Sequence, residues 1–196
     1  MKSFILLISS FLFTHLAFSQ NIPAKVEAIK FATLQDDWVQ MEIQIRARKN
    51  TNPNVKNDRF VDNIKVMSYL AYKRNDKLEK FDFYKAEAEI ISIEQGKKQS
   101  VYFFVPGVIV KRDRLPKTPP YYFVVLEVDG KILPFDNNAF SQATLNSNTI
   151  RSMKLKADVE GESNNYILKP HYNAPVREIG ARLENLAPLI IREPKE

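Results

Sequence analysis

The sequence predicts an all-β protein, a two-layer sandwich of antiparallel strands. Residues 37–48 alternate strictly between apolar and polar side chains, which is typical of a strand with one face on the core and one in water. Further segments of this kind follow at short intervals, separated by turn residues and not by helices. Strands of this number and spacing favour a sandwich, with a closed barrel as the alternative.

The chain begins with a secretory leader. Lys2 gives it a basic start, residues 4–18 are mostly apolar, and Ala17 and Ser19 are the small residues that a signal peptidase reads. We assign residues 1–19 to a signal peptide and expect cleavage before Gln20. The apolar run is too short to span a bilayer, which takes roughly 20 apolar residues. The mature protein is therefore expected to be soluble, exported and not membrane-spanning, in the periplasm or at the cell surface.

The strands can be placed in order along the mature chain. Two of them, 100–105 and 121–128, are apolar on both faces, as central strands are. The inward set of 81–93 changes from Ile90 to Ile91 and Ile93, which a β-bulge would explain. Asp129 and Gly130 form a two-residue hairpin turn. The expected strands are 26–32, 37–48, 60–73, 81–93, 100–105, 121–128 and 131–135.

The chain becomes less regular after residue 135. Residues 153–160 alternate and predict a strand, although Ile150, Met153 and Ala157 also fit one face of a helix.

A C-terminal arm ends the chain. Residues 175–186 carry a helical apolar stripe that Gly180 weakens, so we expect one short helix there. We divide the mature chain into a β-sandwich domain, 20–163, and this arm, 164–196. The arm is expected to dock on the body or on another subunit, where it would give a homo-oligomer.

Composition excludes several kinds of site. The chain has no cysteine, which excludes thiolate metal sites and a cysteine nucleophile. His15 leaves with the leader, so any Ser-His-Asp triad would have to use His171. The sequence has no Gly-x-Ser-x-Gly elbow, no phosphate-binding glycine loop and no His-Glu-x-x-His motif. We therefore predict no enzyme activity, no metal and no cofactor.

The charge is moderately basic, with 29 Lys and Arg against 23 Asp and Glu, a net charge of +6. Loss of Lys2 with the leader leaves +5. A basic exported protein can meet acidic protein surfaces or anionic glycans, and its compartment argues against nucleic acid. The basic residues Lys111, Arg112, Arg114 and Lys117 cluster between two strands, and such loops often carry binding. The alternative is a loop that only keeps the surface hydrated.

A second candidate surface is aromatic. Trp38, Met67 and Tyr69 lie on strand faces opposite the core if the alternation holds. Exposed, they would suggest a protein–protein interface. The alternative is that a second layer or the C-terminal arm covers them.

Carboxylates suggest further sites. Asp36 and Asp37 beside Trp38 resemble a sugar-binding cleft, although a solvated turn before a strand is the favoured explanation. Glu87 and Glu89 share a strand face, but hydrolysis of a glycoside needs two carboxylates across a cleft. The sequence at 136–138 lacks the spaced oxygens of a calcium loop, so we expect a turn there. A hydrolase is accordingly the last of three functional hypotheses.

Three stretches of the sequence resemble a known group. They are Asp-Asp-Trp-Val-Gln-Met-Glu-Ile-Gln-Ile at 36–45, Arg-Phe-Val-Asp-Asn-Ile-Lys-Val at 59–66 and Tyr-Phe-Phe-Val-Pro-Gly-Val at 102–108. With the leader, they are similar to small exported bacterial proteins with an immunoglobulin-like sandwich, some of them encoded with type IV pilus components. The resemblance covers roughly residues 25–135. The long apolar helix of a pilin start is missing, so the resemblance implies an accessory or surface role.

These observations lead to one functional expectation and one alternative. We expect a non-enzymatic exported β-sandwich that acts through contacts with envelope or pilus proteins. The alternative is a carbohydrate-binding module at the cell surface, which would use Asp36, Asp37 and Trp38 together with the basic loop.

Overall fold

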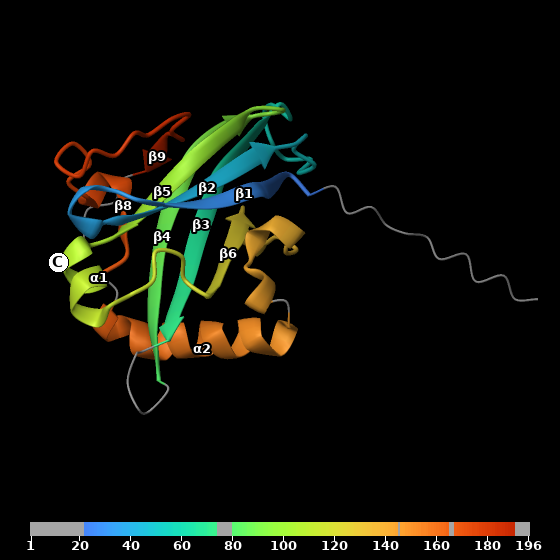
Figure 1. Cartoon of the computed structure of the whole chain (residues 1–196). Coiled ribbons are helices and arrows are strands. Elements are labelled where there is room, and N and C mark those ends of the chain that lie inside the picture. The colour runs from blue at the N-terminus through green and yellow to red at the C-terminus, as the bar shows by residue number, and fades with distance from the viewer. Residues whose placement is uncertain (1–21, 74–79, 145, 165–166, 191–196) are drawn as a thin grey trace, which may run out of the picture.

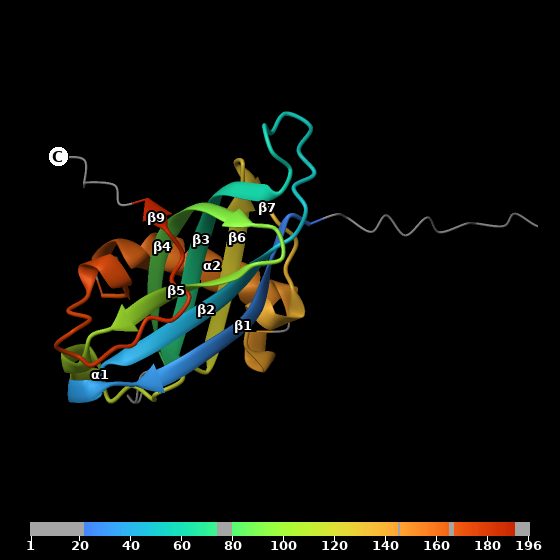
Figure 2. The same cartoon turned by 90° about the horizontal axis from the view of Figure 1, so that it is seen from above.

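The computed structural model describes residues 22–73, 80–144, 146–164 and 167–190, and confirms the sandwich (Figures 1 and 2). The predicted leader and its cleavage site lie outside these residues. The strands form two separate antiparallel sheets rather than a closed barrel. In order, the first sheet is β1 (Ala24–Thr33), β2 (Val39–Ala47), β5 (Lys98–Val105) and β8 (Lys169–Pro170). The second is β7 (Lys131–Ile132), β6 (Tyr121–Val128), β3 (Phe60–Lys73), β4 (Phe81–Glu94) and β9 (Leu189–Ile190).

The main core lies between the sheets and follows the predicted alternation. Every second residue of β2, from Val39 to Ala47, is at most 1% exposed. On β3, Ile64 and Leu70 are fully buried against them. At roughly 1.5–3 kcal/mol for each large apolar side chain removed from water, this layer explains how a chain without cysteine is stabilised.

The set of β4 side chains that faces the core does change near Ile90, but the predicted β-bulge is absent from the pairing of β4 with β3. Ile64 pairs with Ile90 and Asp62 pairs with Ser92, so the register with β3 is constant. Asn63, which has a φ of 52°, is not paired with Ile91 in the ladder. The prediction that Ile91 points inward is wrong, since it is 49% exposed while Ile90 and Ile93 are buried. Asn63 and Ile91 both leave the ladder, so the set of side chains that faces the core changes at the same point on both strands.

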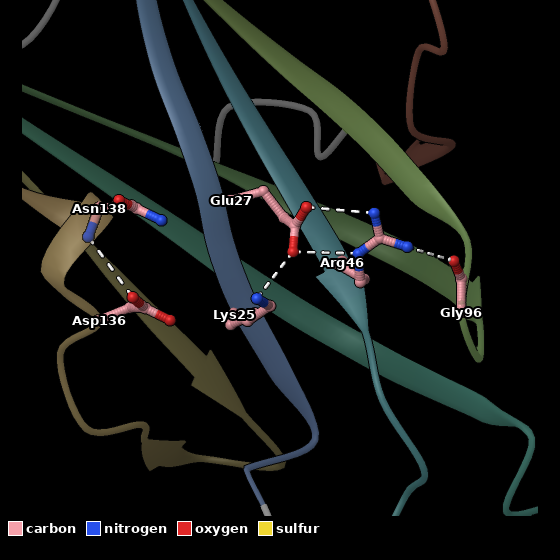
Figure 3. A network of polar contacts seen from close by, with 6 residues as sticks. All are labelled: Lys25, Glu27, Arg46, Gly96, Asp136 and Asn138. Carbon is pink, nitrogen blue, oxygen red and sulfur yellow. Dashed lines mark hydrogen bonds and ion pairs between the residues drawn. The ribbon is translucent and has the colours of Figure 1, made fainter.

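A β-bulge in β1 supports an ion cluster at the open ends of the first two strands (Figure 3). The register with β2 shifts between Val26 and Ala28, at Glu27. Glu27 accepts from Lys25 at 2.8 Å and from Arg46 at 3.0 and 3.1 Å, and Arg46 also donates to the carbonyl of Gly96 at 2.9 Å. Hydrogen bonds from Arg46 and then Lys25 lower the pKa of Glu27 to about 2. The cluster ties β1 and β2 to the β4–β5 turn.

The strand predicted at 153–160 is wrong: this segment lies within the helix α2 (Ser147–Asn164). Met153 and Ala157 are buried against the outer face of the second sheet. Asn146 caps the helix, because its side-chain oxygen accepts from the Asn148 amide at 2.9 Å. Figure 2 shows α2 behind the second sheet, on the side away from the first. The helix α2 thus removes the apolar outer face of the second sheet from water.

The short helix predicted at 175–186 is also wrong. One turn forms, with the Ile179 amide bonded to the Pro175 carbonyl at 3.1 Å, and it ends at Gly180, whose φ is 66°. The described part of the arm docks on its own chain. β8 pairs with β5 in the first sheet, and β9 pairs with β4 in the second. The arm thereby joins the two sheets along one side; its boundary near residue 164 stays a prediction.

Among the described residues, no helix is both long and apolar enough to cross a membrane.

Candidate functional site

The turn between β1 and β2 places two carboxylates and the indole at one end of the sandwich. The turn contains the short 3₁₀ segment η1 (Gln35–Asp37), closed by the Leu34 amide bonded to the Trp38 carbonyl at 2.8 Å. Asp36 and Asp37 adopt left-handed backbone conformations, with φ of 54° and 61°, which Asp tolerates better than most residues. Both carboxylates are exposed.

The helix α1 (Gly107–Asp113) lies against this turn. It occupies part of the segment predicted as a basic loop, and it begins directly after Pro106. Gly107 makes the close approach possible, because a Cβ there would overlap the carbonyl oxygen of Asp36 and lie 2.9 Å from its carbonyl carbon. The next residue, Val108, is 70% exposed. The sequence has no usual start signal for this helix, because Pro106 occupies the cap position and a Pro-Gly pair is typical of a turn.

Together the two elements form what we call the η1–α1 surface, a depression of about 480 Å³ lined by Asp36, Trp38, Val108 and Lys111. The Lys111 ammonium lies 3.3 Å from the carboxylate of Asp37. The sequence placed Trp38 and Lys111 on two candidate surfaces and combined them only in the carbohydrate-binding alternative; the structure brings the two residues together. Val108 was not among the candidate residues predicted from the sequence.

The C-terminal arm covers one side of the Trp38 indole. Trp38 is half-buried and packs in a cluster with Tyr102, Phe104 and Ile179 on the outer face of the first sheet. The Tyr102 hydroxyl donates to the Glu184 carbonyl at 2.8 Å and accepts from the Glu184 amide at 3.0 Å. Trp38 is therefore partly covered by the arm, and the part that remains accessible faces the depression.

The other three basic residues do not line this depression. Arg112 makes two hydrogen bonds of 2.7 Å with the neighbouring Asp113, which raise the pKa of Arg112. Arg114 ends α1 in a left-handed conformation, and Lys117 is exposed in the following segment. With Asp36, Asp37 and Asp113 nearby, this end of the molecule is charged with both signs, and so it is less basic than the sequence suggested.

The expected exposure of Met67 and Tyr69 is wrong, since their side chains are 8% and 0% exposed. They do lie opposite the main core, but α2 covers them. Tyr69 stacks on Phe123 with ring centres 4.4 Å apart, below the ammonium groups of Lys85 and Lys154. The second-layer alternative therefore holds for these two residues.

Asp158 anchors α2 over this cluster, and it accepts from Lys85 at 2.7 Å and from Lys154 at 2.6 Å. Burial alone would raise the pKa of Asp158, but the hydrogen bonds from the two lysines lower it overall.

Of the remaining candidates, Glu87 and Glu89 line a hollow on the second sheet together with Tyr172, the neighbour of His171. His171 is half-buried beside Tyr172, and burial lowers its pKa. Glu87 forms an ion pair of 3.0 Å with Lys65. Asp136 accepts from the Asn138 amide, as the predicted turn requires (Figure 3). Within the part of the chain that the structure describes, no three His, Cys, Asp or Glu residues are placed to hold a metal ion.

Comparison with known proteins adds evidence on the fold. No family model and no curated protein sequence matches the chain. A crystal structure of a protein from Akkermansia muciniphila is similar over 87% of this chain and 94% of that chain, with a TM-score of 0.61 and 14% sequence identity. At this identity the likeness shows a shared fold alone, the all-β sandwich described above.

Proposed function

We propose that the protein is exported, is not an enzyme, and acts through protein contacts as an accessory component of a pilus or another cell-envelope assembly. The η1–α1 surface is the observation that carries the proposal. The Trp38 indole and the exposed Val108 side chain lie there among charges of both signs, on two elements that pack closely against each other. An apolar centre with a charged rim is typical of a protein interface.

Two features of the sequence support the location and the assembly. The leader supports export to the periplasm or cell surface. The resemblance to immunoglobulin-like proteins encoded with type IV pilus components supports an assembly role. The absence of an enzyme activity is supported by the scarcity of imidazoles, because His171 is the single histidine outside the leader and its ring is half-buried.

Site-specific photo-crosslinking in the native cell tests the proposal. A benzophenone amino acid placed at Val108, which is 70% exposed, should give a discrete adduct with an envelope protein. The matched control is Val159, which is 76% exposed on α2 and should not give that adduct. Adding Trp38→Ala to the Val108 probe should weaken the adduct. No adduct from Val108, or the same adducts from both positions, would contradict the proposal.

A carbohydrate-binding function is the second candidate, because Asp36 and Lys111 line the same depression as Trp38. Carboxylate and ammonium groups beside an indole can hydrogen-bond sugar hydroxyls while the ring contacts the apolar sugar face. Trp38 is the chain's one tryptophan, so its fluorescence reports on this site alone. A glycan array supplies the probes. A glycan that binds and shifts the Trp38 emission supports this function, and an array without signal rejects it.

A further inference from the structure

A second hollow, which we call the α2 groove, lies on the opposite side of the sandwich from the arm-covered face. It has a volume of about 450 Å³ and runs between the first half of α2 and the end of the second sheet where β3 stops and β4 and β6 start. Its volume falls within the range of small-molecule sites, about 300–1,000 Å³.

Small and large side chains alternate across the strands to make this hollow. Ala71 on β3 pairs with Phe83 on β4 and with Tyr121 on β6. The alanine methyl leaves open space between the two flanking rings. Phe81 adds a third ring, edge-on to Tyr121 with centres 5.5 Å apart. Since Phe81 and Tyr121 are only half-buried, a ligand can reach both rings, whose planes are inclined to each other at 75°.

The wall of the groove is polar and comes from one face of α2. Asn148, Ser152 and Lys156 follow each other at four-residue spacing, so their side chains line up along the helix. All three side chains are exposed. The Lys156 ammonium lies 5.7 Å from the ring centre of Phe83, and no carboxylate is among the described residues that line the groove. The wall therefore offers one positive charge and several hydrogen-bond donors.

We propose that the α2 groove binds an amphipathic carboxylate, a small molecule with a flat apolar body and an anionic end. The apolar body packs against the rings of Phe81 and Tyr121, face-on to one and edge-on to the other, and the carboxylate accepts from Lys156 and Ser152. Hydrogen bonds to an ionised group are roughly twice as strong as neutral ones, so Lys156 orients the ligand. A neutral sugar fits less well, because it carries no negative charge to pair with the Lys156 ammonium.

Paired probes test the charge requirement. The probes are 4-phenylbutyrate and its uncharged analogue 4-phenylbutyramide, titrated into the purified protein and followed by amide chemical shifts and by saturation transfer to the phenyl ring. The carboxylate should bind saturably, shift amides of α2 near Ser152, and bind about fivefold to tenfold more tightly than the amide. The emission of Trp38 should not change, which separates this site from the η1–α1 surface.

Two variants locate the site. Lys156→Gln should remove the advantage of the carboxylate over the amide, and Lys98→Gln, an exposed lysine on β5 in the other sheet, should retain it. Ala71→Leu should fill the groove and abolish binding of both probes. Because Lys156 is exposed, its variant keeps the proposal testable even if Ala71→Leu fails to fold. Equal affinity for both probes, unchanged selectivity in Lys156→Gln, or no saturable binding in the millimolar range would overturn the proposal.

Discussion

Replacing Gly107 by alanine should separate the two elements that build the η1–α1 surface. Gly107 has no left-handed backbone requirement, and at the first position of α1 an alanine would favour the helix by roughly 0.5–1 kcal/mol. The packing acts in the opposite direction. The new Cβ would overlap the carbonyl oxygen of Asp36 and lie 2.9 and 3.1 Å from the carbonyl carbons of Asp36 and Asp37.

The clash should outweigh the gain in helix propensity. Backbone atoms lie on both sides of the contact, so no flexible side chain can move away, and overpacking of this kind costs about 1–3 kcal/mol. We expect the variant to lose about 2 kcal/mol of unfolding free energy, which corresponds to a fall of about 4–8 °C in Tm for a chain of this size. The emission of Trp38 should shift to longer wavelength as the depression opens.

Thermal unfolding and tryptophan fluorescence of the same samples measure both effects. Gly96→Ala is the control, because Gly96 has a φ of 81° and no atom within 4 Å of an added Cβ. It should cost about 1 kcal/mol through the backbone alone and leave the Trp38 emission unchanged. A Gly107→Ala protein with wild-type Tm and wild-type emission would refute the steric argument.

Three further predictions concern the body of the protein. Glu27→Gln should cost about 0.5–1 kcal/mol at neutral pH, since the site is partly solvated. The folded pKa of about 2 lies below the ordinary 4.5, so the Glu27 carboxylate stabilises the fold fully above pH 4.5 and loses this effect as the pH falls towards 2. Urea unfolding that gives the same free-energy difference between variant and wild type at neutral pH and near pH 2 contradicts this. Tyr69→Phe should leave Tm unchanged or raise it slightly, because the buried hydroxyl has no hydrogen-bond partner among the described residues; a clear fall in Tm would disprove this. Asn146→Ala should remove the cap of α2 and cost about 1 kcal/mol. Amide hydrogen exchange should become faster in α2 and stay unchanged in β2, and an equal loss of exchange protection in both would argue against a local cap.

The sequence by itself determined the strands and most of the core. Strict alternation in β2 leaves only one way to bury Ile43 and Ile45, because neighbouring side chains of a strand point to opposite faces. The hairpin at Asp129 and Gly130 was equally local, and both residues have the positive φ that such a turn requires. These features depend on residues close together in the chain.

Only the tertiary structure decided what covers the outer faces. Residues 153–160 satisfy a strand pattern and a helix pattern, and the helix formed because Met153 and Ala157 could then pack on the ring of Tyr69 and its neighbours in the second sheet. The sequence placed Tyr69 on the correct face, but it could not show that a segment more than 80 residues later would bury it.

The candidate site, like the fold, could be predicted from the sequence only in part. Asp36, Asp37 and Trp38 were visible as a cluster because they are consecutive, as were the basic residues around Lys111. Their meeting depends on the approach of Gly107 to the backbone of Asp36, a contact across 71 positions that leaves no periodic trace in the sequence. Short-range patterns fix which face a side chain occupies, whereas long-range packing decides whether that face is core, covered or open to a partner.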